Sequence, residues 1–249
     1  SKIKKDVTKT SEKPYKIREN SLETILATKK SAFILFSKSE IETQNICGGE
    51  YKMEKFYLEM PSLERKNQII DYVNEFALYN SETNGMGSLR KMLEGYTFEQ
   101  ALEMCLSMQD EEYAKKLGRC QSKTFLLIRE NDDRIIGAIN VRWNLPESMK
   151  QFGGNIGYGI RPTERKKGYN KINLYLGLIE AQKLGLDRVM LDCDVNNLGS
   201  VKTMQALGGK LERIEVDPSD GILTSVYWFD VNETIDKYQN VFKNNICIK

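Results

Sequence analysis

A strand, a glycine-containing loop, a helix and a second strand follow one another over residues 155–195, and this order constrains the fold more than any other feature of the chain. Residues 155–160 alternate between apolar and small side chains, which is typical of a strand. Helical spacing of Ile172, Tyr175, Leu176 and Ile179 predicts a helix over 168–184 that ends at Gly185. A strand is predicted next, at 188–195. Strands joined through a helix in this way lie parallel, so we predict one strand–helix–strand crossover.

The rest of the pattern consists of short strands and helices. Strands are predicted at 55–60, 124–129, 134–143, 210–216 and 223–231, and helices at 63–79, from about 97 to 108, and at 198–207. The order is strand, two helices, three strands, helix, strand, helix and two strands. It predicts a mixed α/β (α+β) domain.

Composition excludes several kinds of chemistry. The chain has no histidine, which removes His-based triads, His metal sites and the commonest general base. The five cysteines show no CxxC spacing, so we expect free thiols and no metal site. A net charge of +2, from 37 basic and 35 acidic residues, argues against nucleic-acid and membrane-surface partners. No segment approaches the ~20 apolar residues that cross a bilayer, and no signal peptide is evident, so a cytoplasmic protein is expected.

Two glycines share one face of the strand at 155–160. Gly157 and Gly159 point away from the apolar side chains of that strand. Glycine weakens a strand, so two on one face indicate that something approaches the backbone closely. A ligand and a tightly packed helix are equally good explanations at this point.

The loop before the central helix has the features of an anion site. Arg165, Lys166 and Lys167 precede Gly168, where the helix starts. Unpaired N–H groups and the helix dipole attract anions at such a position, and a pyrophosphate would fit. An ordinary basic loop on a solvated face is the alternative. The motifs GxxxxGK[ST] and GxGxxG are absent here, which excludes a Walker A loop and a dinucleotide fingerprint.

Two segments together resemble the cofactor motifs of the GNAT acetyltransferases. Residues 165–170 (RKKGYN) resemble the loop [QR]-x-x-G-x-[GA], and Pro162 ends the strand before it, as in that family. About 30 residues on, 197–200 (NLGS) and the helix ending at 207–209 (LGG) are similar to the second motif, N-x-x-[AS] … G-[GF]. The stretches GNIGYGIRPTERKKGY, LDCDVNN and ALGGKLE are similar to a bacterial subgroup of predicted acetyltransferases. The strong match covers 135–211, and a weaker match in element order covers 51–231.

The resemblance implies a fold, a donor and a set of binding residues. The fold would have a central mixed, mostly antiparallel sheet flanked by helices, with the one parallel crossover. The donor would be acetyl-CoA or another short acyl-CoA, held by its pyrophosphate on backbone N–H groups of the loop at 165–170. The loop residues implied are Arg165, Lys166, Lys167, Gly168, Tyr169 and Asn170. The strand from Tyr158 to Arg161 would pair with the pantetheine amides in the gap between splayed central strands. An N–H near Ile160 would stabilise the oxyanion, and Asn197 and Ser200 of the second motif would contact the cofactor.

Two positions depart from the family pattern. Asn170 stands where the loop usually has Gly or Ala, and Asn tolerates unusual backbone geometry, so we expect pyrophosphate binding to be kept. Met204 stands where many members have a tyrosine that protonates the leaving thiolate. A thioether cannot donate a proton. Another group or water does so, or the thiolate leaves unprotonated, or turnover is poor.

Candidate acids and bases lie on the strand at 188–195 and beside it. Asp192 and Asp194 share one face and are candidates for the base that deprotonates the amine, or for attraction of a cationic acceptor. Helix capping by Asp194 and simple solvation of Asp192 are the alternatives. Tyr158 is a candidate proton donor. Cys193 would suit a covalent acyl-enzyme, but a strand cysteine on an apolar face is more often part of the core.

The acceptor is expected to be an amine, of a small molecule or a peptide. In this fold it would meet residues of the first helix pair and the last strands, here Glu64, the loop at 80–88, Trp143 and Tyr227. Three domain segments are predicted, an N-terminal extension (1–50), a GNAT-like domain (51–234) and a C-terminal tail (235–249). A homodimer stays open. The alternatives to an N-acyltransferase are a regulatory domain that binds acyl-CoA without turnover and, far behind, a nucleic-acid-binding protein.

Overall fold

Two antiparallel sheets form the framework of the domain. The computed structural model describes residues 53–248, so the expected extension at 1–50 lies outside the described residues. The first sheet has the order β1 (Phe56–Glu59), β2 (Gln121–Arg129), β3 (Arg134–Trp143), β4 (Ile156–Ile160). The second has the order β5 (Arg188–Asp194), β7 (Leu223–Asp230), β6 (Lys210–Val216).

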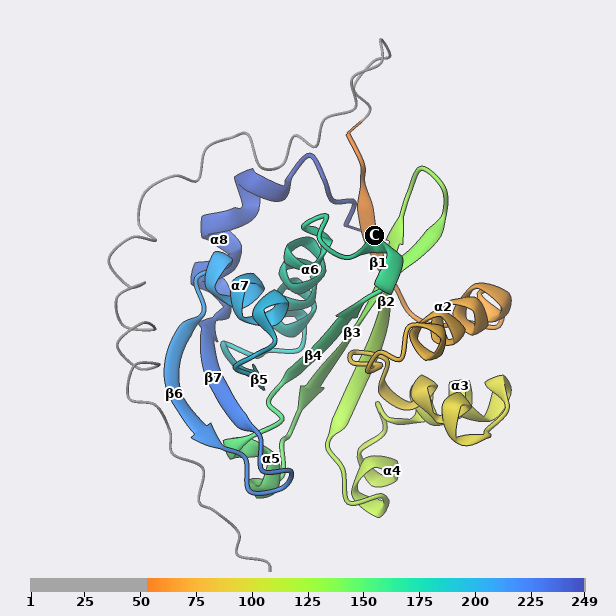
Figure 1. The fold of residues 1–249 in the computed structure, drawn as a ribbon, viewed down its shortest axis with the longest axis horizontal. Coiled ribbons are helices and arrows are strands. Elements are labelled where there is room, and N and C mark those ends of the chain that lie inside the picture. Colours follow the sequence, from red (N-terminus) through yellow and green to blue (C-terminus); the bar gives the residue numbers. More distant parts are fainter. Residues whose placement is uncertain (1–52, 249) are drawn as a thin grey trace, which may run out of the picture. The chain divides into compact units, whose positions relative to one another are not determined.

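Helices cover both faces of the first sheet (Figure 1). One face packs against α2 (Lys66–Leu78), the 3-10 helix η2 (Gly87–Glu94) and α3 (Phe98–Ser107). The other packs against α6 (Tyr169–Lys183), α7 (Leu198–Ala206) and α8 (Val231–Phe242). The remaining short helices are α4 (Glu111–Lys116), α5 (Glu147–Gln151) and η3 (Pro162–Glu164). Burial on both faces explains why residues 125–128 of β2 and most of β3 are apolar.

The crossover that the sequence predicts is present. It runs from β4 through α6 to β5, and the strand β3 has the predicted bounds. The mixed α/β fold with antiparallel sheets flanked by helices is therefore confirmed. Among residues 53–248, no helix combines the length and the apolar character needed to cross a membrane.

Asn155 is the point at which the two sheets meet. Its backbone N–H donates to Met190 O at 2.7 Å, and its side-chain Oδ1 accepts from Met190 N at 2.9 Å. Its Nδ2 donates to Arg142 O at 3.1 Å. Beyond this junction no ladder joins β4 to β5 in the described part of the chain, because the two strands belong to separate sheets. One buried asparagine thus fixes where the strands separate.

The C-terminal segment differs from the expected tail. Residues 235–249 begin inside α8, which starts at the β7 end with Asp230 as N-cap. The rings of Tyr175 and Phe242 lie 4.6 Å apart, which packs α8 on α6. Past α8 the chain pairs with β1, because Phe56 N donates to Asn245 O and Cys247 N to Phe56 O, each at 2.8 Å. The amphipathic pattern of α8 is only about three turns long, which is too short to distinguish this helix from a C-terminal tail in the sequence.

Replacing Asn155 by alanine tests its role at the junction. The change leaves Met190 N–H and Arg142 C=O buried without side-chain partners, so we expect a loss of about 2–4 kcal/mol in the free energy of unfolding. Urea unfolding followed by circular dichroism measures it. Asn232→Ala, at an exposed asparagine that pairs with Gln182, is the matched control and should cost under about 0.5 kcal/mol. Equal losses in the two variants would contradict a special role for Asn155.

Candidate active site

The edge of β4 that faces β5 carries open backbone groups. Arg142 N donates to Asn155 O at 2.7 Å and Arg161 N to Ile136 O at 2.8 Å. With the β3–β4 register, this places residues 155, 157, 159 and 161 in the hydrogen-bonded positions of the antiparallel pair. The N–H groups of Tyr158 and Ile160 therefore point away from β3. They are donors available to a molecule lying between β4 and β5.

The N-terminus of α6 lies beyond the end of β4 and has no side-chain cap. Gly168 occupies its N-cap position with a left-handed φ of 82°, and Lys166 before it has a φ of 65°. A Cβ at Gly168 would meet only Lys171 Cε, at 3.7 Å, so the space in front of this turn is open. Uncapped N–H groups and the helix dipole make this turn suitable for an anion.

The sequence predicts that Arg161 contributes to cofactor binding, but the structure gives it another role. Both its backbone groups are used within the protein, since N–H bonds Ile136 O and C=O accepts from Glu164 N. Its side chain is 2% exposed and pairs with Asp71 and Glu75 of α2, at 2.7 and 3.0 Å. Arg161 therefore ties the end of β4 to α2 and does not contribute an open N–H group, in contrast to Tyr158 and Ile160.

The side chains of two other basic residues in the loop also form hydrogen bonds or ion pairs within the protein. Arg165 donates from Nε to Ile160 O at 3.1 Å and from Nη2 to Ser81 Oγ at 2.7 Å. Lys167 pairs with the buried carboxylate of Glu164 at 2.8 Å. An anion at this loop would thus meet backbone N–H groups and the exposed Lys166 more than a cluster of free cations.

Two further loop residues bind neighbouring elements. The hydroxyl of Tyr169 donates to Glu54 at 2.6 Å, and burial followed by this carboxylate raises the pKa of Tyr169 to about 12. Asn170 Nδ2 donates to Thr203 Oγ1 of α7 at 3.3 Å, while its Oδ1 is buried without a partner. Asn170 therefore joins the starts of α6 and α7 and leaves one acceptor open.

Tyr158 and Ser200 meet across the gap between β4 and α7. Their hydroxyl oxygens lie 2.7 Å apart. Asn197 supports this contact, because its Oδ1 accepts from Ser200 N at 3.1 Å and caps α7. Burial raises the pKa of Tyr158 well above its usual range, although the Ser200 hydrogen bond opposes the shift. The phenol is therefore a protonated donor at neutral pH.

The two predicted carboxylates share a face of β5 and have separate partners. Asp192 accepts from Gly153 N at 2.5 Å, and Asp194 accepts from Asn196 N at 2.8 Å in a turn before α7. Capping of α7 falls to Asn197, so the helix-capping alternative for Asp194 is wrong. Burial raises the pKa of Asp192, against the lowering effects of the Gly153 N–H and Arg142. The raised pKa makes Asp192 a better proton acceptor than an ordinary aspartate.

Cys193 is not suited to act as a nucleophile, and Met204 is not suited to act as a proton donor. Cys193 Sγ lies 3.6 Å from Ser225 Oγ, and burial raises the pKa of its thiol, which keeps it protonated and weakly nucleophilic. Met204 is 0% exposed and belongs to the core beneath α7. Tyr158 is thus the best placed proton donor in this part of the structure.

The loop after α2 covers the glycine face of β4. A Cβ at Gly159 would lie 2.5 Å from Asn84 O, and one at Gly85 would lie 2.7 Å from Tyr158 Cα. A Cβ at Gly157 would lie 2.9 Å from an Nη of Arg142. The two strand glycines therefore admit a loop and a guanidinium, where the sequence left a ligand or a helix open.

The other residues expected to meet the acceptor are scattered. Tyr227 is buried in the main core and accepts from Gln205 Nε2 at 3.3 Å. Glu64 is exposed ahead of α2, and Trp143 is half-buried at the end of β3. Of the expected acceptor residues, those in the loop at 80–88 are the ones that the contacts above place against β4.

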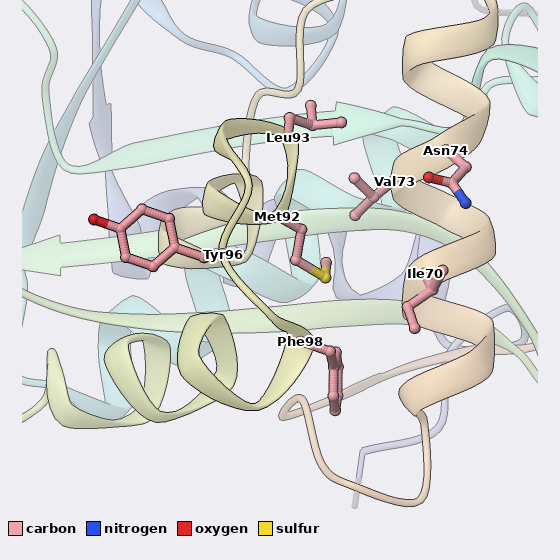
Figure 2. A pocket seen from close by; sticks show the side chains of 7 residues that line it. All are labelled: Ile70, Val73, Asn74, Met92, Leu93, Tyr96 and Phe98. Atoms are coloured by element: carbon pink, nitrogen blue, oxygen red, sulfur yellow. The ribbon is translucent and has the colours of Figure 1, made fainter.

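A separate pocket lies away from this site. It has a volume of about 240 Å³ between α2, η2 and α3 (Figure 2). Its lining residues are Ile70, Val73, Asn74, Met92, Leu93, Tyr96 and Phe98. These side chains include no carboxylate, cation or thiol, so the pocket offers no group for acyl transfer.

A comparison with family models shows to which family the chain belongs. Residues 75–210, more than half of the chain, match the model of the acetyltransferase (GNAT) domain. The chain belongs to the GNAT family of acetyltransferases. The match spans β4, the loop, α6, β5 and α7, which contain the geometry described above. The sequence resemblance to GNAT enzymes is confirmed. No curated protein matches the chain.

Several solved GNAT structures are similar at low identity. The acetyltransferase of this family from Bacillus anthracis is 16% identical, with a TM-score of 0.46 over 73% of this chain and 98% of that one. The ribosomal L7/L12 alpha-N-protein acetyltransferase RimL, solved with coenzyme A, is 14% identical, with a TM-score of 0.49 over 70% and 92%. Spermidine N-acetyltransferase from Vibrio cholerae is 12% identical, with a TM-score of 0.47 over 74% and 98%.

Sequence reasoning about this GNAT site missed two residues. Asn155 positions β4 against β5, but nothing in its sequence context distinguishes it from a polar strand end. Arg142 reaches the glycine face of β4 from β3. The strand pattern of residues 134–143 gives no sign that the guanidinium of Arg142 reaches Gly157, because that contact depends on how β3 and β4 pair.

Asp192→Asn tests whether the carboxylate stabilises the fold or is kept for another purpose. Because burial raises its pKa, the folded state binds this proton more tightly than the unfolded chain, and ionisation at neutral pH opposes folding. We expect the variant to be at least as stable as the wild type at pH 8. The difference should shrink as pH falls towards about 4, the unfolded value for Asp. Urea midpoints at pH 8, 6 and 4 measure it, and a loss above about 1 kcal/mol at pH 8 would show that the charge stabilises the fold.

Proposed function

We propose that this GNAT protein transfers the acetyl group of acetyl-CoA to an amine by direct attack in a ternary complex. The observation that carries the proposal is the alignment of two sets of open N–H groups, those of Tyr158 and Ile160 on β4 and those at the uncapped start of α6. The first set suits the amides of an extended pantetheine arm. The second suits a pyrophosphate.

The residues present fit the donor. The turn at Gly168 leaves open space in front of its N–H groups, and Asn170 Oδ1 is a buried acceptor without a donor beside it. Arg165 holds the Ile160 carbonyl, which leaves the N–H of that residue as the group open to a ligand. The four described cysteines are free, as expected in a reducing compartment such as the cytoplasm.

Acetyl transfer needs an oxyanion donor, a base and an acid. The amine nitrogen forms a bond to the thioester carbon, and the carbonyl oxygen gains charge next to an N–H of β4. One amine proton leaves towards Asp192, directly or through water, because its raised pKa makes it a better base than an exposed carboxylate. The carbon–sulfur bond then breaks, and the thiolate takes the proton of the Tyr158 hydroxyl.

Tyr158 protonates the leaving thiolate, which the thioether of Met204 cannot do. Its hydroxyl lies on the side of β4 that faces α7, where Ser200 holds it at 2.7 Å. Met204 belongs to the same helix α7 but is buried beneath it. A tyrosine on the strand can thus replace a tyrosine on the helix. The pKa of Tyr158, raised by burial, keeps the proton available through the neutral range.

Gly168→Trp should abolish binding of acetyl-CoA, because the indole would fill the space in front of the α6 N-terminus. Isothermal titration calorimetry with acetyl-CoA measures the effect, and we expect at least a 100-fold weaker affinity. Gly185→Trp is the matched control, since Gly185 follows the same helix with a similar φ of 76° and open space around it. Both variants carry the same backbone strain, and only the first should lose the ligand. Wild-type protein that fails to bind acetyl-CoA would contradict the proposed function.

Tyr158→Phe should lower kcat by roughly 100-fold and leave the KM for acetyl-CoA within about threefold, because it removes a proton donor and keeps the ring. Thiol release with a reactive amine measures both constants. Tyr175→Phe is the control, because Tyr175 is also buried but donates to Ile235 O in the core, at 3.3 Å. Equal kcat values for wild type and Tyr158→Phe would assign the proton to water.

A further inference from the structure

Arg142 is a half-buried cation whose guanidinium has no hydrogen-bond or ion-pair partner among the described residues. Its Nε is buried without a hydrogen-bond acceptor, and no hydrogen bond or ion pair to its guanidinium is present among residues 53–248. Burying a charge without a partner is costly, so such groups are rare unless something else compensates them. Asp192 is the opposite charge nearby, but it accepts from Gly153 N and forms no ion pair with Arg142.

The backbone of Arg142 is held in place, which fixes the point from which its side chain extends. Arg142 N donates to Asn155 O at 2.7 Å, and Arg142 O accepts from Asn155 Nδ2 at 3.1 Å. The same asparagine fixes β4 to β5. The position of the guanidinium is thus tied to the position of the gap that would hold the donor.

The guanidinium lies next to the reacting part of β4. An Nη of Arg142 is 2.9 Å from where a Cβ of residue 157 would stand. The next residue is Tyr158, which carries one of the open N–H groups and the proposed proton donor. The loop after α2 covers the same face, with Gly85 N 3.9 Å from that Cβ position. A group bound to Arg142 would therefore lie next to Gly157 and to this loop, close to the strand on which acetyl transfer is proposed.

The charges around Arg142 favour an anion that carries an amine. Arg90 is a second positive charge close enough to affect the pKa of Arg142, which burial lowers. Asp192 is close enough to act on the same guanidinium and could attract an ammonium group. A planar guanidinium fits a carboxylate through two parallel hydrogen bonds.

We propose that Arg142 binds a carboxylate of the acceptor, and that the acceptor is a small amine bearing this group, such as an amino acid. The inference rests on the proposed acetyl transfer and narrows its acceptor. It makes Arg142 a residue that determines specificity, with no part in the chemical step. Removing it should affect acceptors with a carboxylate and spare those without one.

The test uses amines in matched pairs that differ in one anionic group. Glycine is compared with glycinamide, 4-aminobutyrate with butylamine, and phosphoethanolamine with ethanolamine, with spermidine as a cationic probe. Each is scored by thiol release from acetyl-CoA. The corresponding N-acetyl products are scored by thermal shift in the presence of CoA, which needs no turnover. We expect the carboxylate member of a pair to have at least a tenfold higher kcat/KM, or its product a larger shift, than the neutral member.

Variants at Arg142 separate recognition from folding. Arg142→Gln should remove the preference for the carboxylate through KM with kcat nearly unchanged, and Arg142→Lys should restore part of it. Arg142→Met should melt at or above the wild-type temperature, because it removes an unpartnered buried charge. Arg188→Gln, at an exposed arginine stacked on Trp228, should keep the preference.

Several results would overturn the inference. They are a wild-type preference for spermidine or neutral amines, a preference for phosphate over carboxylate, and an anion preference that survives Arg142→Gln. The absence of anion dependence in both assays also counts against it. If acetyl-CoA still binds in that case, the proposed donor site stands and only the acceptor class is wrong. If acetyl-CoA does not bind, the proposed function itself fails.

Discussion

The hydrogen bonds of Asn155 are the constraint on which the rest of this structure depends. A sheet that continued from β4 into β5 would satisfy every backbone group and leave no donors for a ligand. The side chain of Asn155 bonds to the backbone of Met190 and Arg142 and so forms the junction. As a result, β4 and β5 meet at this one point and pair no further. The open N–H groups of Tyr158 and Ile160 follow directly from this arrangement.

The two faces of β4 have different proposed roles. Its alternate side chains put Tyr158 on the side of α7, near the proposed thiolate, and Gly157 and Gly159 on the side of Arg142 and the loop after α2. A larger residue at either glycine would collide with a backbone or a guanidinium. The strand can therefore present its backbone edge to the donor while one face receives the acceptor, without any histidine.

Regular elements with strong periodicity could be predicted from the sequence, and short ones could not. The helix α6 and the strand β3 were predicted nearly to the residue, because a long apolar stripe and an unbroken strand pattern identify them. The helices η2, α4 and α5 are short and polar, so their sequences do not differ from loops. The first turn of α8 continues directly from β7, and the C-terminal pairing with β1 depends on residues almost 200 positions apart.

The contacts of the charged residues at the candidate site also could not be predicted from the sequence. The glycine and the charges of the loop at 165–170 indicate an anion site. In the structure, however, Arg165 and Lys167 are held by a carbonyl, a hydroxyl and a carboxylate, and the preceding Arg161 is held by carboxylates of α2. Counting cations in a sequence overstates how many remain free for a ligand. The reverse holds for Arg142, which looks like one polar residue in an apolar strand. Its lack of a partner is visible only once β4, β5 and the loop after α2 are placed around it, and a cation without an internal partner is the one that a substrate can satisfy.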